Sequence, residues 1–460
     1  MRDVVRKNIE SLGGWICSVD ASAIPEDVLA RAARVLADDV GAIVGARDEP
    51  EVRRFHNLTL SRPGGEESTV LNGGRGRTER RNAAVANGMA ADWLELDEGY
   101  RVTPCHAGLY VIPALLAEAE AANLRFEDML RALVLGYEFV TRIARSWTPR
   151  ALTMQSHGRY CAIGAAAGVA LARGAQARRF IDAVSTAATL TGPSPRTHLI
   201  DGTLARNVWP ATGAWNGFMA VEWAECGIAG APTAFFDVYG TVLGGMPHPE
   251  RLVDGLGERW AMQDGYTKIH ACCQHLHSAI EATLGLRGDL LRDARLEDIE
   301  FMTVDTHGLA LPLTDARPRT TLGAKFSMPH AIAAALVTGT GGAAGFSAAT
   351  LHDPLLAGLR ERVRVQPYAP ELPAPHDRPA RVTVTFKGGR SVQAECLSAQ
   401  GGPDRPLPPE TIFAKLDELA GPVYPRMRAG FEELAKLPGA RRTQGWRPIL
   451  DELVSPEVAA

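Results

Sequence analysis

The chain has 460 residues, of which 46% are hydrophobic and 22% are charged. These proportions are typical of a folded globular protein, and the length suggests two or three domains. The formal net charge is −4 at pH 7. Because no strongly basic surface is indicated, the composition argues against binding to nucleic acid or to an anionic membrane.

The first ten residues alternate charged and apolar side chains, which is unlike a secretory signal. No segment reaches the roughly 18 apolar residues that a membrane-spanning helix needs. The seven cysteines are odd in number and scattered, so they do not suggest a disulfide framework. We therefore expect a cytoplasmic protein.

Apolar residues at helical spacing predict a series of helices in the first half of the chain. One helix is expected after Pro25, with Glu26 and Asp27 in its first turn and Gly45 at its end. Small residues on the later segments predict helices that approach each other closely. These segments are 83–96, 109–121, 126–147, 163–173, 177–190 and 212–226.

The pattern changes after Tyr266. A helix over 277–286 is expected to precede strands at 299–306 and 363–367. Alternating segments at 381–386 and 391–396 flank a Gly-Gly turn, which indicates a β-hairpin. Helical spacing returns after Pro408. The sequence therefore predicts an α+β fold, with a large all-helical domain (1–266 and 401–460) and a smaller inserted α/β domain (267–400).

An acidic segment ends at a histidine. Glu95 and Glu98 are three residues apart and, on a helix, would share one face. Like charges so placed raise a pKa when they are buried, although a solvated helix end is the simpler alternative. His106 precedes a turn before a helix, where it is either functional or a structural hydrogen-bonding residue.

Two basic positions precede helices and are candidates for binding an anion. His157 lies just before an apolar helix, whose N-terminus attracts negative charge. The alternative is a capped helix with an exposed basic pair. Arg206 has the geometry to bind a carboxylate in bidentate fashion, or it pairs with Asp201 instead.

The densest group of polar residues runs from Lys268 to His277. A zinc site is disfavoured because adjacent Cys272 and Cys273 chelate one ion poorly and no second Cys/His pair is visible, so we predict no metal. No known signature surrounds Cys273 as a nucleophile. The remaining interpretation assigns proton transfer or anion binding to Lys268, His275 and His277, in a cleft at the domain junction.

Five segments in the same order resemble the MmgE/PrpD family, which includes 2-methylcitrate dehydratase, cis-aconitate decarboxylase and iminodisuccinate epimerase. They are 84–108, 156–164, 202–206, 268–277 and 324–330. The resemblance implies a helical domain with an α/β lid, a homodimer, and neither metal nor organic cofactor. It also implies a cleft whose chemistry lies near Glu95, His106, His157, Arg206, Lys268 and His330.

Several positions depart from the family pattern. Glu95 stands where the family commonly has Asp, Arg206 stands for a Lys, and His330 for a Tyr. The scaffold is therefore expected to be shared, whereas the reaction and substrate of the best-known members do not transfer directly.

These residues predict a mechanism. Removing a proton next to a carboxylate builds negative charge, which positioned cations stabilise. We expect Arg206 and His157 to bind the carboxylate, and Lys268 or His106 to act as base with a pKa lowered by burial among cations. His330 would protonate a leaving hydroxyl or return a proton to the opposite face.

Glu95 and His277 complete the expected substrate site. The leading hypothesis is a cofactor-independent lyase of the dehydratase type that acts on a small hydroxy-polycarboxylate. The alternatives are an epimerase of a substituted succinate-like acid, a decarboxylase, and a non-catalytic protein that binds a small acid.

Overall fold

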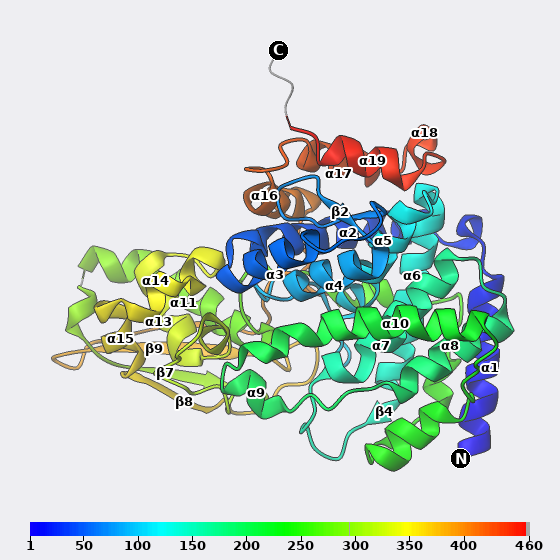
Figure 1. Cartoon of the computed structure of the whole chain (residues 1–460). Helices are drawn as coiled ribbons and strands as arrows, with labels where there is room; N and C mark the ends of the chain where they lie inside the picture. The colour runs from blue at the N-terminus through cyan, green and yellow to red at the C-terminus, as the bar shows by residue number, and fades with distance from the viewer. Residues whose placement is uncertain (294, 457–460) are drawn as a thin grey trace.

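The computed structural model describes residues 1–293 and 295–456 and has an α+β fold dominated by helices (Figure 1). The first ten helices form one body, with α10 across its front in this view. They are α1 (Arg2–Ser18), α2 (Glu26–Gly45), α3 (Pro50–Leu60), α4 (Arg80–Ala91), α5 (Ala107–Ala121), α6 (Phe126–Arg145), α7 (Ser156–Ala172), α8 (Ala177–Thr189), α9 (Arg196–Ile200) and α10 (Trp209–Glu225).

The centre of this body is α7, which packs against α5, α6, α8 and α10. Gly213 and Gly217 of α10 lie directly against Cys161 and Ala165 of α7, so side chains there would overlap them. The predicted close approach of these helices is therefore confirmed. The helix predicted after Pro25 is also confirmed as α2, which runs from Glu26 to Gly45.

Three two-stranded ribbons connect parts of the helical body. They are β1 (Ser68–Thr69) with β2 (Arg77–Thr78), β3 (Gly99–Tyr100) with β6 (Gly265–Tyr266), and β4 (Trp147–Thr148) with β5 (Met246–Pro247). The β3–β6 pair aligns Gly99 with Tyr266. This pairing brings the acidic segment beside the chain that leads to Lys268.

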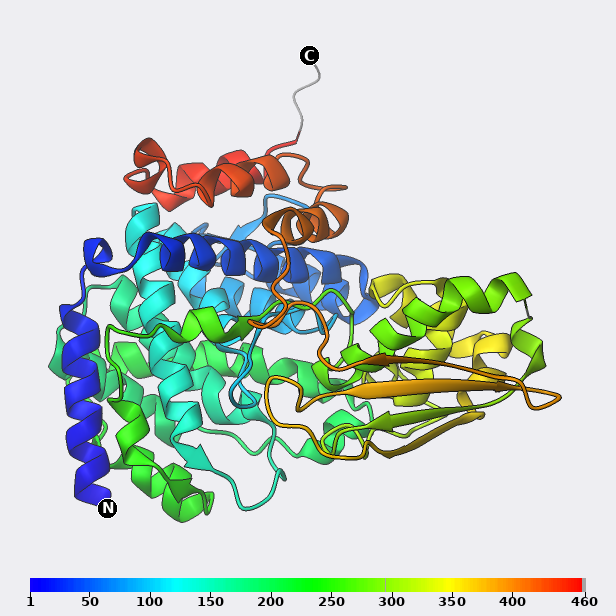
Figure 2. The same ribbon diagram turned by 180° about the vertical axis from the view of Figure 1, so that it is seen from behind.

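A four-stranded sheet lies to one side of the helices (Figure 2). Its order is β10-β9-β7-β8, and β7 runs parallel to β8 but antiparallel to β9. The predicted hairpin is confirmed as β9 and β10. The strands are β7 (Ile299–Thr306), β8 (Val363–Pro367), β9 (Ala380–Phe386) and β10 (Ser391–Cys396).

Alternate residues of β9 are buried, because helices cover one face of the sheet. Helix α11 packs on β9 and β10, and α13 packs on β8. The helices of this region are α11 (His277–Asp293), α12 (Thr321–Lys325), α13 (Met328–Thr338), α14 (Ala348–His352) and α15 (Pro354–Arg360).

The chain then returns to the helical body, where α16 packs on α2. Lys415 of α16 donates to Asp38 of α2 (2.7 Å), to the carbonyl of Leu96 (2.6 Å) and to that of Lys268 (2.8 Å). The last helices are α16 (Pro409–Ala420), α17 (Met427–Leu434), α18 (Gly439–Arg442) and α19 (Trp446–Leu453). The domain limits at 266 and 400 stay a prediction.

None of the helices in the described part of the chain combines the length and the apolar character that crossing a membrane requires.

Candidate active site

The segment between α4 and α5 is irregular and buried. Helix α4 ends at Ala91, so the helix predicted to continue to residue 96 is too long. Glu95 has φ of 54°, in the left-handed region that is uncommon for residues other than glycine. The expectation that Glu95 and Glu98 share a helical face is therefore wrong. Their side chains bind different partners.

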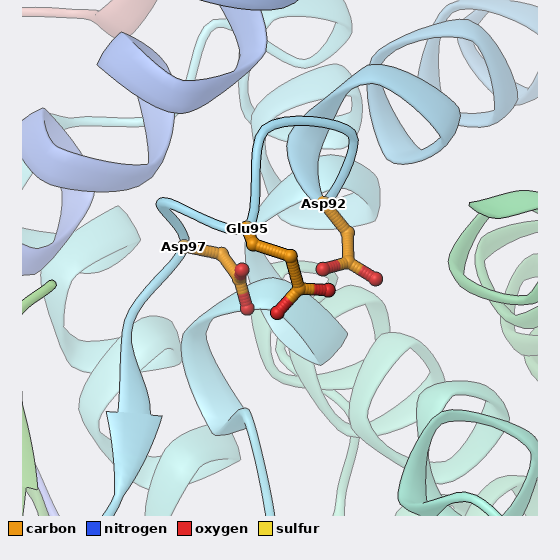
Figure 3. A group of neighbouring side chains, drawn as sticks. All are labelled: Asp92, Glu95 and Asp97. Atoms are coloured by element: carbon orange, nitrogen blue, oxygen red, sulfur yellow. The ribbon is translucent and has the colours of Figure 1, made fainter. Parts of the chain in front are cut away.

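Three carboxylates of this segment, Asp92, Glu95 and Asp97, point toward one another (Figure 3). Arg206 forms ion pairs with Asp92 and with Glu95. Lys268 Nζ lies 3.0 Å from Asp97 Oδ1 and 3.3 Å from Glu95 Oε2. All five side chains are at most 2% exposed. Buried charges are stable only when they are paired, and here each carboxylate has a cation beside it.

The same carboxylates have oxygens close enough together to hold a metal ion. Hard oxygen ligands suit Mg²⁺ or Ca²⁺. However, Arg206 and Lys268 already bond all three carboxylates, so an added cation would have to displace a guanidinium or an ammonium group. The donor set therefore fits a network of ion pairs better than a metal site.

His106 forms a dyad with Asp97. Its Nδ1 lies 2.6 Å from Asp97 Oδ2 and 3.0 Å from the carbonyl oxygen of Glu98. Both partners are acceptors, so Nδ1 carries the hydrogen and donates it. Nε2 has no hydrogen-bond partner among the described residues, and it holds a lone pair when the ring is neutral and a proton when the ring is an imidazolium. A histidine oriented in this way is suited to act as a base.

Glu98 supports this arrangement from behind. It accepts hydrogen bonds from the backbone N–H of Gly108 and from the Tyr137 hydroxyl, the latter at 3.0 Å. A Cβ at Gly108 would lie 2.6 Å from Asp39 Oδ2, so a larger residue there would displace this side chain. Burial raises the pKa of Glu98 to about 8, although both hydrogen bonds oppose the shift.

The pKa of Lys268 is shifted in the direction opposite to the one expected. Burial alone would lower the pKa of Lys268, but Asp97 and Glu95 outweigh burial and raise the pKa well above its ordinary value. The expected lowering of its pKa among cations is therefore wrong, because its nearest neighbours are anions. Lys268 is a permanent cation and a poor base.

His157 packs against His106. The centroids of the two rings are 5.1 Å apart, and the rings meet edge to face. The Nδ1 atom of His157 lies 3.0 Å from the Tyr110 hydroxyl, and its Nε2 lies 2.8 Å from Asp92 Oδ2. Burial and then Arg206 lower the pKa of His157 well below its ordinary value. A neutral, fully buried ring does not bind a carboxylate as a cation, so that expectation is wrong.

A cleft opens in front of His106. We call Glu95, His106, Arg206 and Lys268 its inner wall, and Arg196, Gln274, His275 and Arg378 its outer wall. The three arginines and Lys268 of these walls are cations, whereas Glu95 is the one carboxylate among the lining residues. The rest of the lining consists of Tyr100, Pro104, Leu152, Gln155, Ser156, Leu199, Tyr266, Cys273, Leu309 and Phe326.

Comparison with known proteins identifies the family of the chain. Residues 10–246 match the model of the MmgE/PrpD N-terminal domain, and residues 270–437 match that of the MmgE/PrpD C-terminal domain. The chain belongs to the MmgE/PrpD family. The resemblance found in the five sequence segments is thereby confirmed.

Three curated relatives of this MmgE/PrpD protein are fungal. A cis-aconitate decarboxylase-like protein, oryM, of Aspergillus oryzae is 26% identical over 90% of each chain. A cis-aconitate decarboxylase of Aspergillus terreus is 26% identical over 96% of this chain and 95% of its own. A further Aspergillus terreus cis-aconitate decarboxylase is also 26% identical, over 90% of this chain and 89% of its own. The similarity therefore covers nearly the whole chain.

Two predicted site residues of this MmgE/PrpD protein, His330 and His277, lie away from the cleft. His330 Nε2 lies 3.1 Å from the Gly345 carbonyl oxygen, and its Nδ1 lies 3.2 Å from Arg360. Ser327 Oγ accepts the backbone N–H of His330 and so caps α13. His330 is buried and does not line the cleft, so its expected role as proton donor is wrong.

His277 is the second predicted residue that lies away from the cleft. It begins α11, its Nε2 lies 3.2 Å from the Cys272 carbonyl oxygen, and its ring packs 4.9 Å from that of His270. It does not line the cleft, so its predicted contact with substrate is wrong. Within the same segment it is His275 that faces the cleft.

Sequence reasoning missed two residues of the outer wall. Arg196 begins α9, and Arg378 lies in a Pro-rich loop two residues before β9. An arginine next to the start of a buried strand is a weak signal, because most such residues are exposed. Only the tertiary structure shows that both line the cleft.

Proposed function

We propose that the protein is a lyase that acts on a small polycarboxylic acid. In this proposal Arg206 and Lys268 hold a substrate carboxylate, and His106 moves a proton at the neighbouring carbon. The observation that carries the proposal is the Asp97–His106 dyad, whose free nitrogen meets a cleft lined by cations. The family membership and the names of the fungal relatives support it.

The carboxylates of the inner wall fix its two cations. Because Glu95 bonds both Arg206 and Lys268, neither cation has to reorganise when negative charge develops on the substrate. Burial strengthens this interaction, because little water competes for the charges. The inner wall is therefore suited to stabilise a carbanion next to a carboxylate.

His106 serves two related reactions. In a dehydration, Nε2 takes the proton from the carbon and that C–H electron pair forms the C=C bond. The C–O bond breaks, and the hydroxyl leaves as water with the proton that His106 returns. In a decarboxylation, the bond to a carboxylate breaks, CO₂ leaves, and the electron pair on carbon takes a proton from the His106 imidazolium. The names of the relatives favour decarboxylation, and dehydration is the second candidate.

Inversion of the carbon is less well supported. An epimerase needs a second base on the opposite face of the carbon. Across the cleft, burial and then Arg378 lower the pKa of His275 well below its ordinary value. Arg196 and Arg378 do not accept protons at neutral pH. With His106 as the one proton-transfer group assigned in the cleft, a lyase is favoured over an epimerase.

We also propose that the enzyme works without metal or organic cofactor, as a cytoplasmic homodimer. The ion pairs of the carboxylates support the first point. The homodimer is proposed from the family resemblance alone.

The test is proton NMR in D₂O with cis-aconitate, citrate and related acids. We expect either loss of CO₂ with solvent deuterium at the carbon that is protonated, or loss of water with a new C=C bond, and no effect of a chelator. Deuterium in an inverted substrate without new product would indicate an epimerase. Thermal stabilisation without turnover would indicate a binding protein, and inhibition by the chelator would restore the metal hypothesis.

A further inference from the structure

The outer wall of the cleft has positive charge without carboxylate partners. Arg378 donates to the side-chain oxygen of Gln274 and to the Arg101 carbonyl oxygen, at 3.3 Å for the latter. Its Nε is buried and has no partner. No ion pair joins Arg378 or Arg196 to a carboxylate within residues 1–293 and 295–456.

The neighbouring groups do not neutralise this positive charge. His275 Nδ1 and His307 Nε2 are buried without partners, and the two rings lie 5.1 Å apart. Asp377 is the nearby carboxylate, but it is engaged by Arg101. Burial and then Arg101 lower the pKa of Arg378 to about 10. Arg378 is partly buried, and a cation so placed without a carboxylate partner is costly, so an anionic ligand would offset that cost.

We propose that Arg378 and Arg196 form a second carboxylate subsite, which makes this enzyme specific for acids with at least two carboxylates. The proposal rests on the proposed function and extends it. Arg206 and Lys268 hold the carboxylate next to the reacting carbon, and the outer wall holds another. Guanidinium groups suit this role because they bind carboxylates through two parallel hydrogen bonds.

The subsite joins distant parts of the chain. Arg196 comes from α9, Gln274 and His275 follow Lys268, and Arg378 precedes β9. Arg378 also lines an adjoining cavity with Arg101 and His307, so it stands where the cleft meets a second opening. A ligand that bridges the two walls would therefore contact both the helical body and the region of the sheet.

The test separates binding from chemistry. Titration calorimetry on His106→Asn protein, at fixed salt, would use tricarballylate as a probe with three carboxylates and butyrate as a probe with one. Adding Arg378→Gln should weaken tricarballylate binding about 10- to 100-fold, as expected for loss of charge-assisted hydrogen bonds. Butyrate binding should change less than about twofold.

Arg381→Gln is the matched control. Arg381 lies three residues away and pairs with Glu395 at 2.8 Å on the sheet, so its loss removes one nearby charge without touching the cleft. Tricarballylate binding should stay within about twofold of that of the parent protein. Arg196→Gln provides a second variant should Arg378→Gln fail to fold. It should weaken the same probe selectively.

Equal weakening of both probes, no weakening, or no tricarballylate binding by the parent protein would overturn the subsite. The proposed function fails separately, if otherwise wild-type enzyme releases neither CO₂ nor water from any acid of the NMR panel. Turnover of that panel with unchanged binding in Arg378→Gln would overturn the subsite alone.

Discussion

The two walls of the cleft carry positive charge in different ways. On the inner wall, Arg206 and Lys268 are buried and held by Asp92, Glu95 and Asp97. On the outer wall, Arg196 and Arg378 have no carboxylate partner among the described residues. The difference shows two ways to build an anion site. Folding compensates the inner cations, whereas the outer ones gain most from a ligand.

Breaking the proton-transfer dyad of the inner wall should have the largest effect. His106→Asn removes the base but keeps a group able to donate to Asp97. We expect kcat to fall by about 10²- to 10⁴-fold, the usual contribution of general acid–base catalysis. Steady-state kinetics on the best acid of the panel measures this, with circular dichroism to check folding. Retention of more than a tenth of kcat would exclude His106 as the base.

The ion pairs of the inner wall should matter for stability. Arg206→Met leaves Asp92 and Glu95 buried with one cation fewer, so the free energy of unfolding should fall by about 3–5 kcal/mol. Urea denaturation measures the loss. Arg178→Met is the control, because its pair with Asp182 is on the surface, and it should cost less than about 1 kcal/mol. Similar losses in both variants would contradict the contrast between buried and exposed pairs.

Behind the inner wall, Glu98 should make stability depend on pH. Its pKa is about 8 in the folded state against an ordinary 4.5. Between these values the folded state holds a proton that the unfolded state has lost, so stability should fall as pH rises from about 4.5 to 8.

Glu98→Gln keeps an acceptor for Gly108 and a polar partner for Tyr137 but cannot ionise. Its melting temperature should therefore decline less than that of the wild type between pH 5 and pH 8.5. Thermal unfolding across that range provides the measurement. Parallel curves would show that Glu98 has an ordinary pKa.

The smallest effect is expected away from both walls. His330→Asn should leave kcat within about twofold of the wild-type value. Its ring contacts Gly345 and Arg360 and does not line the cleft. Stability should fall by about 1 kcal/mol through the lost hydrogen bonds. A loss of kcat as large as that in His106→Asn would return His330 to the site.

Much of the regular structure follows from residue pattern alone. Strand β7 has the predicted limits of 299 and 306, and the Gly-Gly turn forms the predicted hairpin. The limit of α4 was mispredicted because Trp93, Leu94 and Leu96 continue the apolar spacing beyond Ala91. The chain leaves helical geometry at Asp92, and the left-handed backbone at Glu95 and the β3–β6 pairing that follow both depend on tertiary structure.

The site was partly predictable for a similar reason. Motif order brought His106, Arg206 and Lys268 together correctly, because the whole scaffold is shared with the family. Protonation states were not predictable, since the pKa of Lys268 depends on carboxylates from another segment. His330 was misassigned because the motif match does not show where its side chain points, and the ring contacts Gly345 and Arg360. The sequence does not show which arginines lack partners.

Lys415 has a consequence for the order in which the enzyme matures. During synthesis, Asp38 and the backbone of Lys268 leave the ribosome long before the residue whose ammonium group joins them. A nascent chain that ends before α16 would carry an unneutralised aspartate at the heart of its first domain. Catalytic competence should therefore arise only after translation has passed residue 415, which would delay carboxylate chemistry until the polypeptide is almost complete.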